Sequence, residues 1–431
     1  MLYNINRNKT NLNILEEQYS SGKKIQRTSD DPVIAVRSLK LRTNLAELNQ
    51  YYKKNIPDAK SWMNVTEGAL NTANQLLTSM HKYMVQGAND TLTKADRDSI
   101  VKNLKELSAQ IYQEGNTDYA GRYVFGGYKT DTSLLFEKDR TDLSYTITES
   151  FKGNQIENIT KVKDYGEFSN YDLSNLSPED IGNSPELIHG YRIQLSYMDL
   201  AKDVDGQGDL EIEASPEGDL PKLITKSMND PDAYEPADNE VHYIPDTGEV
   251  ILGKEAFNQL RKKEDISITY KKDIFKEGDL RPEHYFNCQK LDKNDPDGKE
   301  INYTLSNQKI QYEVSFNQKL TINTQGRDAF THDIARSIED IIFAIEEVEK
   351  TESKIAEVEK YLKDPSVEDK EGLERLLKNL DAELSLKNKV LQEVFGDGMT
   401  AVSKQQDMVN VAVADLGSRY VRLELTESRL A

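Results

Sequence analysis

The chain has 431 residues, a formal net charge of −20, 37% hydrophobic residues and 30% charged residues. This length allows two or three domains, the polar composition favours elongated parts with thin cores, and the single cysteine, Cys288, excludes an internal disulfide framework. The negative charge argues against phosphate-bearing partners, which are nucleic acid and an anionic membrane surface.

The N-terminal part of the chain is patterned for long helices with narrow apolar stripes. The first helix carries a row at heptad-compatible spacing, which consists of Ile5, Leu12, Leu15 and Tyr19. Gly22 is suited to end this helix in the left-handed conformation. Asp31 followed by Pro32 predicts the start of the next helix, because Asp is a favoured N-cap and Pro fits the first helical position.

Two further helices are predicted before residue 115. Pro57 is expected to start one of them, with an apolar face made of Trp62, Val65, Ala69, Leu76, Met80 and Tyr83. Thr93 and Asp96 have the spacing of a capping box. This box would open a fourth helix, whose apolar residues are Ile100, Leu104, Leu107 and Ile111. Most of these stripes are expected to be covered by other helices of the same chain.

The pattern changes to short strands from Asn116 onward. Glycines and aromatic residues between 116 and 136 predict a strand or hairpin, and residues 129–325 contain short β-type runs between turn residues. The segment Pro245–Gly248 reads as the turn of a hairpin. The stretch 301–324 should supply two or three strands.

Helical spacing returns at about Asp328. One seam contains Ile338, Ile341, Ile345, Val348, Ile355 and Leu362, and Pro365 should break it. A second helical run follows, which the glycines at Gly396 and Gly398 are expected to kink or end. The last thirty residues carry two apolar rows, formed by Val402, Val409, Leu416, Leu423 and Leu430 and by Val413 and Tyr420. Such seams are stable only when covered, so the simplest expectation is that the N- and C-terminal helices pair.

The order of helices, strands and helices predicts a multidomain α+β fold. Long coiled-coil-like helices from both termini would form a helical bundle, and a β-rich domain would be inserted between them. Residues 1–128 are expected to form the N-terminal half of the helical assembly domain and residues 129–326 the outer β-rich domain. Residues 327–431 would form the C-terminal half, which pairs with 1–128.

Three stretches resemble the terminal signatures of the flagellin family: QYSSGKKIQRTSDDP (18–32), RYVFGGYKTDTSLLF (122–136) and VADLGSRYVRLELTESRL (413–430). The motif residues are Gly22, Asp30, Asp31, Pro32, Phe125, Gly126 and Gly127. The residues of these motifs are more similar to those of the hook-associated members at the junction between hook and filament than to those of the filament subunits. The resemblance covers the first 136 residues and about the last hundred.

The resemblance implies a secreted structural subunit of the extracellular flagellum, exported unfolded through the flagellar type III apparatus and acting as an adaptor between hook and filament. Its terminal helices would pack against neighbouring subunits, and its central domain would face outward. The implied partners are other hook-associated proteins, flagellin, copies of the same chain and an export chaperone. Relative to the family, segments before Met1 and after Ala431 are missing, so we expect this chain by itself to be monomeric.

No catalytic, cofactor or metal site is predicted. The segment 203–211 resembles a calcium loop, but Gln207 stands where a ligand is needed, so an acidic turn is favoured. The five histidines show no zinc spacing, and Cys288 has no assignable basic partner. No stretch resembles a cleaved signal peptide or a membrane span. The alternatives to a junction subunit are a flagellin that forms the filament and a coiled-coil stalk displaying a β-rich binding domain, and an enzyme is not expected.

Overall fold

The computed structural model describes residues 1–89, 92–163, 173, 176–181, 184–202, 209–215, 221–295, 298–365 and 370–430. The chain forms two compact units. Unit 1 comprises Met1–Met63, Gln311–Ile322 and Gly417–Ala431, and unit 2 comprises Asn64–Ile310 and Asn323–Leu416. Each unit is described by itself below.

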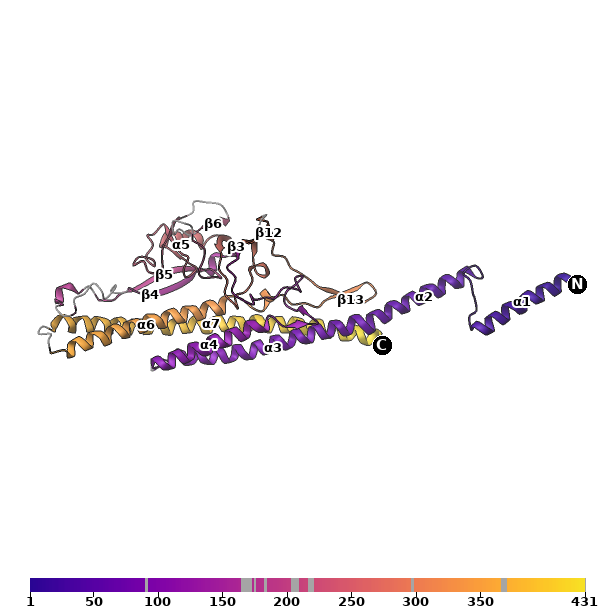
Figure 1. Cartoon of the computed structure of the whole chain (residues 1–431), viewed down its shortest axis with the longest axis horizontal. Helices are drawn as coiled ribbons and strands as arrows, with labels where there is room; N and C mark the ends of the chain where they lie inside the picture. Colours follow the sequence, from indigo (N-terminus) through magenta and orange to yellow (C-terminus); the bar gives the residue numbers. More distant parts are fainter. Residues whose placement is uncertain are drawn as a thin grey trace. The chain divides into compact units, whose positions relative to one another are not determined.

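Long helices occupy both terminal parts of the sequence, and short strands lie between them in the sequence (Figure 1). The helices are α1 (Leu2–Ser21), α2 (Pro32–Gln50), the π-helix η1 (Tyr51–Asn55), α3 (Ile56–Gly87), α4 (Lys94–Glu114), α5 (Lys254–Leu260), α6 (Asp333–Lys363) and α7 (Glu371–Leu430). This order confirms the predicted α+β class, with helices from both termini around a β-rich centre. The division of the chain at residues 128 and 326 stays a prediction.

In the described residues, the strands form four separate sheets. Their bounds are β1 (Asp118–Tyr119), β2 (Arg122–Tyr123), β3 (Leu143–Phe151), β4 (Glu157–Val162), β5 (Leu187–Gln194), β6 (Leu210–Ser215), β7 (Lys222–Thr225), β8 (Glu240–Ile244), β9 (Glu249–Leu252), β10 (Asp265–Lys272), β11 (Asn287–Asp292), β12 (Glu300–Tyr303), β13 (Gln311–Ser315) and β14 (Gln318–Thr321). Two sheets have five strands, in the orders β12-β11-β3-β10-β6 and β4-β5-β9-β8-β7, and the pairs β1-β2 and β13-β14 are hairpins.

Apolar side chains of the two larger sheets meet in one core. Tyr145 and Ile147 of β3 and Tyr270 of β10 belong to the same buried cluster as Tyr243 of β8 and Val250 of β9. Burial alternates along β3 and β10, so each strand turns one row of side chains into this core. The predicted hairpin is confirmed, since β8 and β9 pair across the turn at 245–248, where Gly248 has a φ of 64°.

The predicted helix ends are confirmed where local chemistry sets them. Gly22 ends α1 with a φ of 66°, in the left-handed region. The carboxylate of Asp31 accepts hydrogen bonds from the backbone N–H groups of Val33 and Ile34, both at 3.1 Å. Thr93 and Asp96 form the complete capping box at the start of α4.

Pro57 does not start a new helix, which corrects the prediction. The helical backbone continues from α2 through η1 into α3, and Pro57 lies at the second position of α3. A proline inside a helix lacks an N–H and clashes with the carbonyl four residues earlier. The π-helical turn immediately before it widens the backbone at that point, so the chain continues instead of ending.

The glycines at 396 and 398 do not end the C-terminal helix either. α7 runs without interruption from Glu371 to Leu430. A Cβ on Gly398 would lie 3.2 Å from the sulfur of Met84 and 3.3 Å from Ile341 Cδ1. Gly398 therefore lets three helices approach closely, and the stability supplied by this packing exceeds the modest cost of glycine in a helix.

Within unit 2, helices from the two ends of the chain pack together. α6 and α7 run side by side, and α3 and α4 lie along them (Figure 1). The guanidinium of Arg97 on α4 donates two hydrogen bonds, of 2.7 and 2.8 Å, to the carboxylate of Glu352 on α6. The ring of Phe395 on α7 fills the space left by Gly87 on α3. The carboxylate of Asp340 on α6 pairs with Arg192 on β5 at 2.9 Å, which ties a sheet to the helices.

Candidate assembly surface

The apolar row of α1 is open to solvent. Leu12 is 65% exposed and Tyr19 is 93% exposed, and Ile5 and Leu15 are likewise exposed. No residue of α1 is buried. An isolated helix of this length is only marginally stable in water, because most helix stability in proteins comes from packing of the apolar face. The predicted row is therefore present but has no cover in unit 1.

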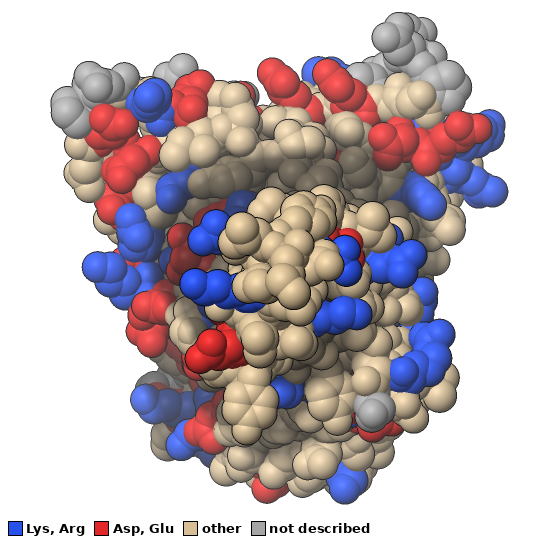
Figure 2. Space-filling view, turned by 90° about the vertical axis from the view of Figure 1, so that its right-hand side faces the viewer, with Lys and Arg blue, Asp and Glu red and all other residues tan. Residues whose placement is uncertain are grey.

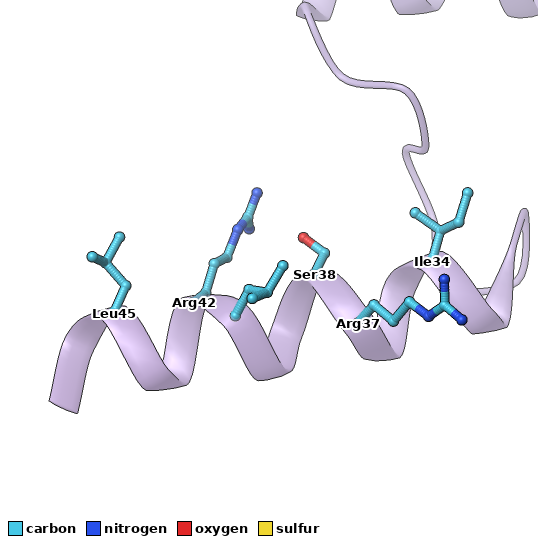
Figure 3. Close-up of a pocket in the computed structure, with 6 residues that line it drawn as sticks. Ile34, Arg37, Ser38, Arg42 and Leu45 are labelled. Carbon is cyan, nitrogen blue, oxygen red and sulfur yellow. The ribbon is translucent and has the colours of Figure 1, made fainter. Parts of the chain in front are cut away.

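The apolar row of α2 is also uncovered, although the rows from Met1 to Ile111 are predicted to be covered by helices of the same chain. None of the residues of α2 is buried. Its row forms a shallow groove lined by Ile34, Arg37, Ser38, Leu41, Arg42 and Leu45, of which five are labelled in Figure 3. In Figure 3, Ile34 and Leu45 project on the same side of the helix as Arg42. Basic side chains thus flank an apolar stripe in a chain whose net charge is −20.

The linker between α1 and α2 is held by the motif residue Asp30. Its carboxylate accepts hydrogen bonds from the backbone N–H groups of Gln26 at 3.0 Å and Arg27 at 2.8 Å. These two bonds lower the pKa of Asp30. The residues Gly22, Asp30, Asp31 and Pro32 therefore act on the backbone, ending one helix and starting the next, and no ligand is needed to explain them.

The second motif shapes a tight turn. The ring of Phe125 is buried and meets Phe330 edge-on, with the centroids 5.1 Å apart. A Cβ on Gly126 would lie 2.6 Å from the carbonyl oxygen of Lys129. Gly127 has a φ of 62°, and a Cβ there would lie 2.3 Å from Gln308 Oε1. Only glycine fits these two positions, so this motif also has a structural role.

The C-terminal row differs from the N-terminal one in being covered. Val402, Val409, Leu416 and Leu423 are all buried, and Val413, Tyr420 and Leu430 are half-buried. The opposite face of α7 carries a second set of exposed apolar residues, Val411, Val421 and Leu425. The predicted seam of α7 is thus packed within the chain, whereas the predicted seam of α1 is not. The role of either seam in contacts between subunits stays a prediction.

Within unit 1, helix α7 contacts α3 through two partly exposed ion pairs of Lys60. The ammonium of Lys60 lies 2.5 Å from Glu427 Oε2 and 3.8 Å from Glu424 Oε1. It also lies over the ring of Tyr420, 5.7 Å from the centroid. The hydrogen bond to Glu427 raises the pKa of Lys60. This contact holds the end of α7 against the start of α3 in a fixed register.

The sequence patterns did not point to two features of this surface. The first is the pairing of Lys60 with Glu427, which are 367 residues apart and carry no local signal. The second is η1, where the signal was available: Leu48 and Ile56 are eight residues apart, although the rows on either side repeat every seven. An extra residue in a heptad pattern is a recognisable sign of a wider turn.

No metal-binding cluster accompanies these helices in the part of the chain that the structure describes. Over the described ranges, no group of three or more potential ligand side chains could hold a metal ion. The calcium-loop resemblance at 203–211 falls mostly on 203–208, outside the described residues. Cys288 is buried in the sheet core, and burial raises the pKa of its thiol to about 12. It therefore packs as a small apolar residue.

Charge and hydropathy add two further observations. Figure 2 shows Lys and Arg side chains interspersed with Asp and Glu on the face that it presents, so the net charge of −20 is not a uniformly acidic surface there. Among the helices that the structure describes, none is both long enough and apolar enough to cross a lipid bilayer.

The N-terminal helices are similar to a known protein family. Residues 1–130 match the family model described as the bacterial flagellin N-terminal helical region. Flagellar hook-associated protein 3 of Escherichia coli is 32% identical over 123 residues, which are 28% of this chain and 38% of that protein. A flagellin of Clostridium tyrobutyricum is 36% identical over 116 residues, 27% of this chain and 30% of that protein. These matches therefore span well under half of the relatives' length.

A solved structure aligns over more of the chain but at low similarity. The flagellar junction protein FlgL of Legionella pneumophila aligns with 91% of this chain and 99% of its own, at 13% identity and a TM-score of 0.32. A TM-score this low does not establish a shared fold. The likeness to this family thus depends on the N-terminal match alone. The comparisons show that residues 1–130 of this chain are similar to the bacterial flagellin N-terminal helical region.

Proposed function

We propose that this protein is a structural subunit of the bacterial flagellum that acts as an adaptor at the junction between hook and filament. The observation that carries the proposal is the pair of uncovered apolar rows on α1 and α2 within a flagellin-type N-terminal region. Rows of this kind contribute stability only when another surface covers them, at about 1.5–3 kcal/mol for each large side chain. Neighbouring subunits in the assembled flagellum would supply that cover.

The mechanism is assembly-coupled ordering of the terminal helices. Before assembly α1 is solvated on all sides and weakly folded, so the subunit has little tendency to polymerise on its own. During assembly, helices of neighbours bury the rows through heterologous contacts that close into a ring. The expected partners are other hook-associated proteins, flagellin and further copies of this chain, with a chaperone before export. The site of action is the extracellular flagellum, and no catalytic activity is part of the proposal.

The residues of the two motifs and the similarity to hook-associated protein 3 favour a junction subunit over a filament subunit. Flagellin remains the second candidate, because a flagellin matches over nearly the same length with slightly higher identity. A coiled-coil stalk that displays the β-rich domain is the third candidate.

Immunogold labelling of purified flagella tests these candidates against each other. The antibody is raised against residues 129–325, which contain the two large sheets. One label where the hook meets the filament is the expected result. Label along the whole filament would identify a filament subunit instead. Intact flagella without label would reject both flagellar roles and favour the stalk.

A further inference from the structure

One extra residue separates the apolar rows of α2 and α3. Large buried side chains repeat every seven residues along α3, at Ile56, Met63, Leu70, Leu77 and Met84. The row of α2 has the same repeat, at Ile34, Leu41 and Leu48. The interval from Leu48 to Ile56, however, is eight residues. In an uninterrupted α-helix, an offset of one residue would turn the α2 row by about 100° away from the α3 row.

The extra residue is accommodated in η1. The backbone N–H of Ile56 donates to the carbonyl of Tyr51, five residues earlier, so this turn holds one residue more than an α-helical turn. Pro57 supplies a local reason for the widening. In a regular α-helix its ring would clash with the carbonyl of Lys53, and it has no N–H to donate.

Two alignments of α2 with the buried rows of α3 can be compared directly. A second buried row of α3 contains Ala59, Thr66, Ala73 and Met80. Continued without the offset, the two heptad rows of α3 would pass through Ala35, Ser38, Arg42, Leu45, Asn49 and Tyr52. Shifted by one residue, they pass through Ile34, Arg37, Leu41, Asn44, Leu48 and Tyr51. The shifted set holds four large apolar side chains and the unshifted set only two. In addition, Tyr51 is buried whereas Tyr52 is exposed, as the shifted alignment requires.

We propose that η1 is a phase-correcting turn, which absorbs the extra residue so that the rows of α2 and α3 lie on one side of a continuous helix. Its consequence is a single apolar seam that runs from Ile34 past η1 to Met63. The use of this seam by neighbouring subunits rests on the proposed function, whereas the phase itself is a property of the helix alone. A straight partner helix could then cover the exposed α2 part of the seam, in line with the residues of this chain that already cover Ile56 and Met63.

The hairpin β13-β14 holds the wide turn in place. Asn55 Nδ2 donates to the carbonyl oxygen of Glu313 at 2.8 Å, and Gln50 Nε2 donates to Asn55 Oδ1 at 3.0 Å. On the following turn, the hydroxyl of Tyr312 donates to the carboxylate of Asp58 at 2.5 Å. The hairpin thus binds side chains at the C-terminal end of η1 and just beyond it, while Gln50 at the other end bonds to Asn55, and these contacts stabilise a helical form that is otherwise rare.

A deletion and an insertion in η1 test the proposal in the isolated chain. Lys53 is exposed, and its deletion is combined with Pro57→Ala so that a regular α-helix is possible. The matched variant inserts one Ala after Lys53, and Pro57→Ala alone is the control. Spin labels at Leu41→Cys and Val421→Cys report the direction of the α2 row by pulsed electron resonance, with buried Cys288 left in place.

The deletion is expected to keep the direction of the row, because it removes both the extra residue and the wide turn. The label distance should then change by only about 1.5 Å, the rise of one residue. The insertion is expected to rotate the row by about 100° and shift the distance distribution accordingly. Rotation in the deletion variant, or an unchanged distribution in the insertion variant, would overturn the phase-correcting role.

Flagellar assembly provides an independent measurement. Cells that express the deletion variant should assemble flagella, and cells that express the insertion variant should lose assembly. Assembly that survives the insertion would overturn the use of the seam by neighbours, even if the spin labels report the predicted rotation. Neither result depends on whether the immunogold label lies at the junction or along the filament, so failure of the phase proposal and failure of the junction proposal are distinguishable.

Discussion

The backbone of Gly87 on α3 lies against the ring of Phe395 on α7, so closely that a Cβ on Gly87 would be 2.3 Å from Phe395 Cε1. Phe395 is fully buried, and its ring replaces the missing side chain of the glycine. This contact joins helices from opposite ends of the chain within unit 2. The close packing of the ring explains why the last residue of α3, Gly87, is a glycine.

Gly87→Ala is therefore expected to destabilise the protein, by about 1–3 kcal/mol, because an added methyl group in a full site forces neighbours to move. The matched control is Gly68→Ala on the same helix, where a Cβ meets no atom within 4 Å. That control should raise stability by about 0.5–1 kcal/mol, since alanine favours the helix. Chemical denaturation measures both, and equal effects of the two substitutions would refute the packing argument.

A buried ion pair within α7, which Glu347 and Thr351 of α6 also contact, supports a second prediction. The ammonium of Lys387 lies 2.9 Å from Glu383 Oε1 and 3.0 Å from Glu347 Oε2, and it donates to Thr351 Oγ1 at 3.1 Å. Glu383 is fully buried. Lys387→Met should destabilise the protein by about 3–5 kcal/mol, because it leaves a buried carboxylate without its cation.

The double variant Lys387→Met/Glu383→Leu is expected to regain most of that loss, since apolar residues of similar size can replace a buried pair at little cost. Lys363→Met, which removes an exposed partner of Glu359, should change stability by less than about 1 kcal/mol. Thermal unfolding of the three variants gives the comparison. A double variant as unstable as the single one would contradict the assignment of the loss to the unpaired carboxylate.

The buried His332 predicts acid sensitivity. Its ring is enclosed by Tyr197, Tyr285 and Phe286, with centroids at 4.8, 4.9 and 5.3 Å. Burial, with a smaller contribution from Arg336, lowers its pKa from 6.5 to about 3. The unfolded chain therefore binds a proton near pH 6.5 that the folded chain does not bind, so stability is complete above that pH and falls below it, by about 1.4 kcal/mol per pH unit.

His332→Phe should keep the aromatic packing and remove this contribution to the pH dependence between pH 6.5 and pH 3. The free energy of unfolding, measured by urea titration at several pH values, reports the slope. His284 stays as an internal reference, because burial lowers its pKa to about 4 as well and the variant leaves it untouched. An unchanged slope in His332→Phe would show that the buried ring is not a source of the acid sensitivity.

The exposed α1 predicts low local stability in the isolated chain. No residue of this helix is buried, and Lys23, Lys24 and Arg27 lie in the exposed linker that follows it. Amides of α1 should exchange with solvent far faster than those of α3, whose residues Leu70 and Leu77 are fully buried. Brief trypsin treatment should cut the linker first. Protection of α1 amides comparable to α3 in the isolated chain would contradict assembly-coupled ordering.

Much of the helical architecture could be predicted because the deciding interactions are local. The left-handed Gly22, the cap at Asp31 and the box at Thr93 and Asp96 depend on residues within one helical turn, and all three predictions are confirmed. The hairpin turn at Gly248 was predictable for the same reason. Pro57, read by the same local rules, gave a wrong helix boundary, because one π-helical turn outweighed them. The end of α7 that Gly396 and Gly398 allowed is likewise absent, since Gly398 packs against distant residues.

The sequence by itself determined where most helices begin and end, which faces are apolar, that strands lie between two helical ends, and the N-terminal family resemblance. These properties follow from spacing and from backbone chemistry within a few residues. Only the tertiary structure decided which apolar rows are covered, because cover depends on which other segments of the chain pack against each row. The row at Leu423 is buried while the row at Leu12 is exposed, although both have heptad spacing. Strand order and the pairing of Lys60 with Glu427 were likewise set by contacts between residues far apart in the chain.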